Sequence, residues 1–178
     1  MMTGAPLYRL AQPADVTAIV QLVHSAYRGD SSRLGWTTEA DLLDGQRTDP
    51  AEVSELVVAT DKRLLLSELS GELVGCVLVK HEPPAVAQIG MFAVRPTLQG
   101  RGLGKGLLVE AERAAREDFQ ASRAEMTVIE QRSDILAWYQ RLGYQHTGAS
   151  EPFPYGNPRF GLPRRPDLRF LVLAKALE

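Results

Sequence analysis

A glycine-rich segment past the middle of the chain is the feature that most limits how this sequence can fold. Residues 99–104 read Gln-Gly-Arg-Gly-Leu-Gly, and they separate an apolar run at 89–94 from an amphipathic pattern at 103–119. This order predicts a strand, a tight turn and a helix. N–H groups at a helix start have no intrahelical partner and lie in the positive field of the helix dipole. With Arg101 and Lys105 alongside, we expect this turn to bind a pyrophosphate-bearing ligand.

Two familiar phosphate-binding loops do not fit this segment. A nucleoside-triphosphate loop requires a hydroxyl residue after its Gly-Lys pair, but Gly106 follows Lys105, and Gln99 stands where the first glycine would be. A dinucleotide-binding turn belongs to an early βαβ unit, whereas these alternating glycines lie past mid-chain. A turn that only connects strand to helix remains an alternative from the motif alone.

The same segment resembles the signature of the GNAT superfamily of N-acetyltransferases, Gln/Arg-x-x-Gly-x-Gly/Ala, and matches it at every specified position. Residues 91–96 are similar to the lead-in that precedes this signature, and residues 137–144 resemble the family's fourth helix and following strand. The resemblance covers the chain from about residue 89 to residue 144. It implies a mixed α/β fold, with a central, mostly antiparallel sheet of about seven strands and helices on both faces.

Hydrophobic periodicity and turn signals predict elements in a matching order. Helices are expected at 16–27 with Asp15 as the cap, at 38–44, at 103–119, and after Ser133 or Asp134 until Gly143. Strands are expected at 7–10, 55–59, 63–69, 73–80, 87–94, 124–129, 144–147 and 169–173. Early hairpins and a late β-loop-α-β unit independently predict a mixed sheet with helices on both faces.

The resemblance implies acetyl-CoA as the cofactor and indicates where it binds. Its pantetheine arm is expected between the strands at 87–94 and 124–129, where backbone N–H groups of the first strand face it. The expected cofactor contacts are Phe92, Ala93, Val94, Gln99, Gly100, Arg101, Gly102, Leu103, Gly104 and Lys105. Relatives often carry an asparagine seven residues before the tyrosine of the fourth helix. Arg132 stands there in this chain, and we expect it to meet a CoA phosphate instead.

Tyr139 is the candidate catalytic residue, because it occupies the position where many relatives carry a tyrosine as general acid for the CoA thiolate. The alternative is that Tyr139 only packs, since it belongs to one helical stripe of apolar and aromatic residues.

No general base is visible in the sequence. The strand at 86–91 has no carboxylate or histidine where some relatives place a glutamate. His81, Glu82 and Glu130 lie near strand ends as candidate relays, and Gln88 is able only to orient a water. Cys76 lies in an apolar strand without a neighbouring histidine, so we expect it to pack rather than to carry an acyl group.

Two segments are expected to form the acceptor site, with Tyr27 and Trp36 from residues 27–36 and Tyr155 from the loop at 151–161. The loop is equally compatible with a self-packed surface or with a contact in a homodimer. The charges near these segments leave the acceptor's chemistry open. Arg159, Arg164 and Arg165 favour a carboxylate-bearing acceptor, whereas Asp30, Asp41 and Asp44 favour a cationic amine.

Composition limits the remaining classes of function. A chain of 178 residues is expected to form one domain, residues 1–178, and its net charge of −2 does not indicate a nucleic-acid partner. No apolar run reaches the length of a membrane span, and the N-terminus lacks a secretory signal, so we expect a cytoplasmic protein. One cysteine and three scattered histidines do not predict a metal site.

Together these features predict an N-acetyltransferase that transfers an acetyl group from acetyl-CoA to a primary amine of a small molecule or peptide, directly in a ternary complex. A catalytically inactive acyl-CoA-binding or regulatory domain on the same fold is the main alternative. Phosphoryl transfer from a nucleotide is disfavoured, because the lysine-hydroxyl pair and a metal-binding acid are missing.

Overall fold

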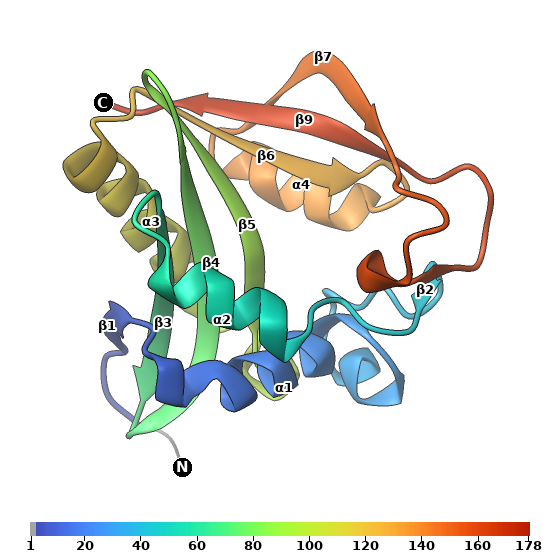
Figure 1. Ribbon diagram of the computed structural model, residues 1–178, viewed down its shortest axis with the longest axis horizontal. Coiled ribbons are helices and arrows are strands. Elements are labelled where there is room, and N and C mark those ends of the chain that lie inside the picture. The colour runs from blue at the N-terminus through green and yellow to red at the C-terminus, as the bar shows by residue number, and fades with distance from the viewer. Residues whose placement is uncertain (1–2) are drawn as a thin grey trace.

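A seven-stranded sheet forms the centre of the computed structural model, which describes residues 3–178 (Figure 1). The strand order is β1-β3-β4-β5-β6-β9-β7, and only the β5–β6 pair is parallel among the neighbours in this sheet. The strands are β1 (Leu7–Leu10), β3 (Lys62–Leu69), β4 (Glu72–Glu82), β5 (Val86–Val94), β6 (Arg123–Ile129), β7 (Gln145–Pro152) and β9 (Arg169–Ala176). A small second sheet pairs β2 (Leu43–Asp44) with β8 (Leu162–Pro163). The predicted mixed, mostly antiparallel sheet is confirmed.

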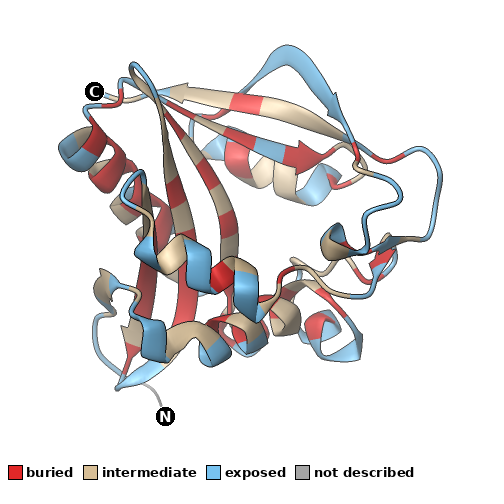
Figure 2. Cartoon of the chain, in the orientation of Figure 1, coloured by how far each residue is buried: buried red, intermediate tan, exposed pale blue. Residues whose placement is uncertain are grey.

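Among residues 3–178, four α-helices cover the large sheet. Helices α1 (Val16–Tyr27) and α2 (Pro50–Val58) lie on one face, and α3 (Leu103–Phe119) and α4 (Ser133–Arg141) lie on the other (Figure 1). Figure 2 shows that buried residues concentrate on the strands and on the helix sides that face them. The helices therefore enclose two apolar layers, one on each side of the sheet.

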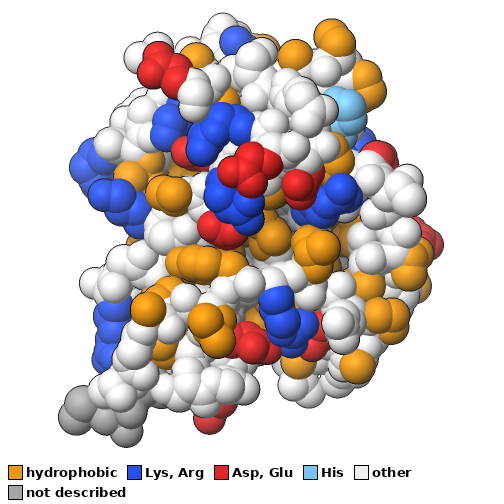
Figure 3. All heavy atoms as spheres, turned by 90° about the vertical axis from the view of Figure 1, so that its left-hand side faces the viewer, with side chains coloured by type: hydrophobic (Ala, Val, Ile, Leu, Met, Phe, Trp, Pro, Cys, Tyr) orange, Lys and Arg blue, Asp and Glu red, His pale blue; other side chains and the backbone are white. Residues whose placement is uncertain are grey.

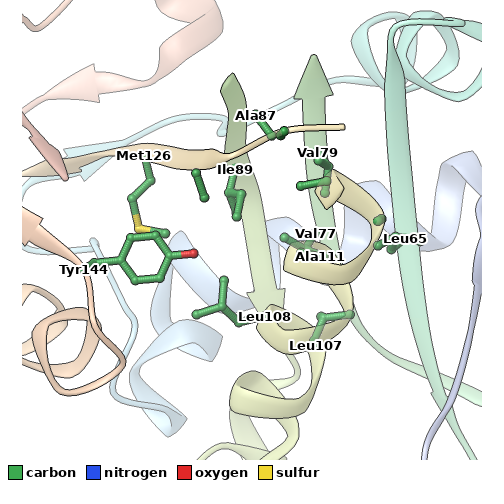
Figure 4. Close-up of a cluster of buried hydrophobic side chains, with 14 of the residues drawn as sticks. Leu65, Val77, Val79, Ala87, Ile89, Leu107, Leu108, Ala111, Met126 and Tyr144 are labelled. Atoms are coloured by element: carbon green, nitrogen blue, oxygen red, sulfur yellow. The ribbon is translucent and has the colours of Figure 1, made fainter. Parts of the chain in front are cut away.

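The alternation of side chains along the strands divides the core between these layers. Val77 and Val79 of β4 pack with Leu107 and Leu108 of α3, whereas Cys76 of the same strand packs in the layer beneath α1. Figure 4 shows the α3 layer, in which apolar side chains of β3, β4, β5 and β6 meet the helix. Each fully buried side chain of this kind contributes about 1.5–3 kcal/mol by leaving water.

The second helix lies elsewhere than the sequence predicts. The prediction of a helix at 38–44 and a strand at 55–59 is wrong, because the chain turns at 38–42 and the helix α2 spans Pro50–Val58. In the turn, the Thr38 hydroxyl accepts a hydrogen bond from Ala40 N at 3.1 Å, which competes with helix formation. Asp49 caps α2 by accepting from Glu52 N at 2.7 Å, and Pro50 takes the first helical position. Asp49 and Pro50 are the residues in the sequence that mark the start of this helix.

Two predicted helix caps also need correction. Asp15 precedes α1, but its carboxylate makes no capping bond to that helix. It accepts instead from Gln12 N at 2.8 Å and from Arg9, and the Arg9 guanidinium holds the pKa of Asp15 below its usual range. At α4, Ser133 is the first helical residue and no side chain caps the helix.

The strands β5 and β6 separate after a short parallel start. They pair only at Val86, Ala87 and Gln88 of β5, opposite Arg123, Ala124 and Glu125 of β6. Beyond this point the two strands run apart, which is visible in Figure 1. The expected divergence between these strands is therefore present, and it leaves one edge of β5 without a strand partner. Ligands of mixed sheets bind at such points.

A β-bulge lies on β5 beside this divergence. Ala93 pairs with Cys76 and Gly90 with Leu78, so Met91 and Phe92 of β5 together stand opposite one residue of β4. Met91 takes a φ of +43°, which is unusual for a residue with a side chain. The bulge redirects the backbone of β5 where it faces the open edge.

Charged side chains of both signs are interspersed over the face of the molecule shown in Figure 3. On α3, for example, Arg113 forms salt bridges with Glu110 and Glu117, and Asp118 pairs with Arg63 at 3.2 Å. Within residues 3–178, no helix combines the length and the apolar character that crossing a membrane requires.

Candidate functional site

Two cavities meet at the divergence of β5 and β6. One has a volume of about 500 Å³ and lies beside the glycine-rich segment, and we call it the loop cavity. The other has a volume of about 290 Å³ and is lined by several aromatic rings, and we call it the aromatic cavity. Both volumes suit small ligands. The two cavities share Tyr27, Phe92, Ile135 and Tyr139 in their linings.

The glycine-rich segment presents unpartnered backbone donors to the loop cavity. Gly100 and Gly102 take φ angles of +79° and +82°, which only glycine adopts readily. The first amide of the helix start to bond internally is that of Gly106, which donates to Gly102 O at 3.0 Å. In residues 3–178, the four preceding amides make no hydrogen bond: those of Gly102, Leu103, Gly104 and Lys105. With the dipole of α3 behind them, these amides make a candidate anion site.

Cationic side chains surround this anion site. Lys105 and Arg141 line the loop cavity, and Arg101 is exposed next to it. None of the three forms a salt bridge within the part of the chain that the structure describes. The sequence did not identify Arg141 as a candidate cofactor contact, although it lies two residues after Tyr139 on the same helix. The surroundings of the four amides are thus positive, as a diphosphate requires.

Gln99 uses its side chain on the protein itself. Its Oε1 accepts from Trp36 N at 2.8 Å and from Thr37 N at 3.3 Å, and its Nε2 donates to Val94 O at 3.0 Å. The contact is close enough that a Cβ on Gly35 would lie 2.4 Å from Gln99 Oε1. Gln99 therefore ties the segment at 36–37 to the end of β5, and this role was not apparent from the sequence.

Arg132 holds the same segment from the other side. Its guanidinium donates to Thr37 O at 2.9 Å and to Trp36 O at 3.3 Å, and it forms a salt bridge with Asp134 at 3.2 Å. The side chain is only 6% exposed. The expected contact of Arg132 with a CoA phosphate is therefore not supported, because these buried contacts occupy its guanidinium. Trp36 instead lines the loop cavity with its ring packed against Trp138, at 5.9 Å between centroids.

Tyr139 stands where the two cavities meet. Its side chain is 8% exposed and its ring packs against Phe92, Trp138 and Tyr144. Its hydroxyl makes no hydrogen bond among residues 3–178, although the side chain lines both cavities. Burial raises the pKa of Tyr139 well above its usual value of 10. The hydroxyl therefore stays protonated at neutral pH and is free to donate.

Tyr27 fixes the bulge at the same junction. Its hydroxyl donates a hydrogen bond to Phe92 O, and burial raises the pKa of Tyr27 above 10. The carbonyl of Phe92 therefore points toward the C-terminal end of α1, where Tyr27 lies. Tyr27 and Trp36 both line the loop cavity, and Tyr27 also lines the aromatic cavity.

Besides Arg101, three predicted contact residues have side chains that line neither cavity. Ala93 is 3% exposed and packs beneath α1, and Leu103 packs against Leu69, Val74 and Leu98. Tyr155 lines neither cavity, because its hydroxyl donates to Arg165 O at 2.8 Å and accepts from Leu168 N at 2.9 Å. It braces the loop in which it lies.

The candidate relays also lie outside both cavities. Glu82 pairs with Lys80 at 2.9 Å, Glu130 pairs with Arg169 at 2.6 Å, and Gln88 donates to Glu125 at 3.1 Å. His81 stacks on Phe119 at 5.1 Å between centroids. The acidic residue that lines the aromatic cavity is Glu39, whose carboxylate accepts from Arg28 at 2.6 Å.

Cys76 is fully buried, with its thiol directed to Met91 O at 3.4 Å, and burial raises its pKa to about 12. A thiol with that pKa is a poor nucleophile at neutral pH. Residues 3–178 contain no group of three or more His, Cys, Asp or Glu side chains placed to hold a metal ion.

Each of the arginines and aspartates that left the acceptor's charge open has an ion-pair partner, and most of these partners lie outside that group. Arg159 pairs with Asp49 at 3.1 Å and Arg165 with Asp167 at 2.5 Å. Arg164 lies 3.8 Å from Asp44, and Arg33 forms salt bridges with both Asp30 and Asp41. The loop at 151–161 contributes apolar groups to the aromatic cavity instead, namely Phe153, Pro154 and Phe160.

Comparisons with known proteins agree with this geometry. A sequence model of the Acetyltransferase (GNAT) family matches residues 17–144. The mycothiol acetyltransferase of Salinispora tropica is 30% identical over 158 residues, which cover 86% of this chain and 48% of that protein. The mycothiol acetyltransferase of Tsukamurella paurometabola is 29% identical over 145 residues, covering 79% of this chain and 48% of that protein. The chain thus spans about half the length of the curated relatives it matches.

Solved structures share the fold at lower identity. Ard1 from Thermoplasma volcanium superposes with a TM-score of 0.72 and 15% identity, covering 98% of this chain and 99% of that one. YncA from Salmonella typhimurium, solved with its cofactor acetyl-CoA, superposes with a TM-score of 0.71 and 19% identity, covering 98% and 95%. The IAA acetyltransferase from Bacillus cereus gives a TM-score of 0.66 and 19% identity, covering 97% and 100%.

Proposed function

This chain belongs to the acetyltransferase (GNAT) family and uses acetyl-CoA, and we propose that it transfers the acetyl group directly to a primary amine of a small molecule or peptide. The observation that carries the proposal is the junction at Tyr139. There, the cavity beside the unpartnered amides of α3 meets a second cavity that is large enough for an acceptor.

The loop cavity fits the diphosphate and the pantetheine arm of acetyl-CoA. The free amides from Gly102 to Lys105 supply hydrogen-bond donors for the diphosphate, and Lys105 and Arg141 supply positive charge. The open edge of β5 offers backbone groups to the amides of the arm. When bound, acetyl-CoA supplies an acetyl thioester, which is activated toward an amine.

Tyr139 is proposed to act as the general acid. Its unpartnered hydroxyl is protonated at neutral pH and lies at the junction, so it is placed to give a proton to a departing thiolate. The reaction also needs a neutral amine and donors for the developing oxyanion. We assign the oxyanion donors to backbone N–H groups of β5 at the bulge beside Phe92.

Strand β5 has no carboxylate that could accept the proton from the amine. Glu39 is the acidic residue of the aromatic cavity, and its charge is already balanced by Arg28. We therefore propose that water carries the proton from the amine out of the aromatic cavity.

Calorimetry with acetyl-CoA and a thiol-release assay over a panel of amines test this function. We expect binding of acetyl-CoA and thiol release that depends on the amine. Binding without amine-dependent release from any member of the panel would favour the inactive acyl-CoA-binding domain. Absence of binding would contradict both readings.

A further inference from the structure

Arg47 carries a positive charge that no acidic side chain in residues 3–178 balances. It lines the aromatic cavity, with its guanidinium 5.9 Å from the centroid of the Tyr27 ring. Across residues 3–178 it has neither a salt bridge nor a side-chain hydrogen bond. A half-buried guanidinium with five free N–H groups is a strong site for a planar anion, and a carboxylate matches its geometry with two parallel hydrogen bonds.

The other charges of the aromatic cavity are already neutralised. Arg28 pairs with Glu39 at 2.6 Å, and Arg132 pairs with Asp134 at 3.2 Å while donating to the carbonyl groups of residues 36–37. Arg47 therefore leaves the cavity with one uncompensated positive charge. A cationic acceptor would be repelled there, whereas an acceptor with a carboxylate would be attracted.

The backbone that carries Arg47 is fixed on its C-terminal side. The next residue, Thr48, is fully buried, and its carbonyl oxygen lies 3.0 Å from His24 Nε2. Asp49 then caps α2. Because these contacts hold the chain, the Arg47 side chain starts from a defined position beside the cavity, as a specific binding group requires.

Many of the other residues that line the cavity are apolar. Phe153, Phe160 and Phe170 line it together with Met126 and Ile129, and these residues come from β6, β9 and the loop between β7 and β9. Such a lining accommodates a large apolar side chain. Arg47 and these apolar side chains thus come from different parts of the chain and line the same cavity.

We propose that the acceptor is an α-amino acid with an apolar or aromatic side chain, and that Arg47 binds its carboxylate. This inference rests on the proposed acetyl transfer. Tyr27, whose ring lies under Arg47, also lines the loop cavity and bonds to the bulge of β5. A carboxylate on Arg47 places the α-amine two bonds away from the carboxyl carbon, toward this junction and Tyr139. The apolar side chain then packs against the phenylalanine rings of the lining.

The test compares L-phenylalanine with phenethylamine, which is the same molecule without its carboxylate. With acetyl-CoA saturating, we expect kcat/KM for L-phenylalanine to exceed that for phenethylamine by at least about tenfold, the value of one good charge-assisted contact. Arg47→Met should bring the ratio of the two values close to one, and Arg47→Lys should retain part of it. Arg33→Met is the matched control, because Arg33 pairs with exposed aspartates and lines neither cavity, and it should keep the wild-type ratio.

Direct binding separates this inference from the proposed function. Calorimetry of L-phenylalanine and phenethylamine, in the presence of CoA, should show tighter binding of the amino acid to the wild type and loss of that difference in Arg47→Met. If the protein acetylates phenethylamine as well as L-phenylalanine, the acyltransferase function stands and the carboxylate site is wrong. If amines bind with the expected preference but no thiol is released, the carboxylate site stands and acetyl transfer is wrong. Equal binding of both compounds overturns the inference whatever the turnover.

Discussion

The side-chain amide of Gln99 forms hydrogen bonds with both the backbone and the side chain of Thr37. Gln99 Oε1 accepts from Thr37 N at 3.3 Å, and Gln99 Nε2 donates to Thr37 Oγ1 at 2.7 Å. Gln99 begins the glycine-rich segment, and Thr37 belongs to the loop between α1 and α2. One residue of the motif thus holds a wall of the loop cavity in place through its side chain.

Replacing Gln99 with alanine should therefore reduce stability as well as cofactor binding. The amides of Trp36 and Thr37 would lose their acceptor, which costs about 1–3 kcal/mol when such groups stay partly buried. Chemical denaturation measures the loss, and the KM for acetyl-CoA should rise with it. Gln21→Ala, at an exposed position on α1, is the control and should change neither quantity. An unchanged midpoint for Gln99→Ala would show that the contact carries no energy.

Removing the Tyr139 hydroxyl should slow the chemistry and leave the fold intact. Because this hydroxyl has no partner within residues 3–178, Tyr139→Phe should shift the unfolding free energy by less than about 0.5 kcal/mol. Loss of a general acid should lower kcat by about a hundredfold or more. Tyr155→Phe provides the comparison, since Tyr155 lines neither cavity and its loss should leave kcat at the wild-type level. A Tyr139→Phe enzyme with wild-type kcat would assign Tyr139 to packing alone.

The expected pH dependence of kcat follows from the ionisation of Tyr139. Burial raises the pKa of Tyr139 well above 10, so its proton remains bound throughout the neutral and mildly alkaline range. We expect no fall in kcat from Tyr139 ionisation below about pH 10. A decline in kcat at lower pH that disappears in Tyr139→Phe would contradict this assignment.

Lys105 should contribute to affinity for the cofactor and little to turnover. It is exposed at the start of α3, lines the loop cavity and has no carboxylate partner in the described chain. Lys105→Ala should raise the KM for acetyl-CoA several-fold, in line with about 0.5–1 kcal/mol for one screened charge, and should weaken its dependence on salt. Lys80→Ala, which removes a lysine paired with Glu82 away from the cavities, should have no such effect. Equal KM values for the two variants would remove Lys105 from the anion site.

Cys76 should react with thiol reagents only when the protein unfolds. It is fully buried and its pKa is raised to about 12, so the native state holds the thiol proton more tightly than the unfolded chain does. The native state therefore loses stability relative to the unfolded chain as the pH rises above the ordinary thiol pKa of about 8.5. Labelling with a chromogenic disulfide at pH 8 should be slow in buffer and fast in denaturant. Rapid labelling of the folded protein would show that the thiol is accessible.

The parts of the fold set by local chemistry could be predicted from the sequence. Gly100 and Gly102 require a left-handed backbone, and the apolar stripe that follows them defines α3 with the bounds observed, Leu103–Phe119. The second helix was missed because its signal is the pair Asp49 and Pro50, whereas the β-branched residues near its end favour a strand. The strand preference of the valines therefore led to a predicted strand, although the Asp49 cap marks the start of a helix.

The parts of the site set by distant contacts could not be predicted. Whether an arginine forms an ion pair depends on residues far away in the sequence. Arg159 pairs with Asp49, which lies 110 positions away, whereas Arg47 pairs with no acidic residue in residues 3–178. The inward role of Gln99 likewise depends on a loop 62 positions away. Sequence patterns indicate which groups can bind an anion, but only the tertiary arrangement decides which of them remain available.

The shared lining of the two cavities has a kinetic consequence. Tyr27, Phe92, Ile135 and Tyr139 lie between two cavities, and under the proposed function one cavity holds acetyl-CoA while the other holds the acceptor. In the proposed mechanism both reactants bind before either product leaves, and no side chain carries the acetyl group between them. Initial-rate plots at several fixed concentrations of the second reactant should therefore give lines that intersect and do not run parallel.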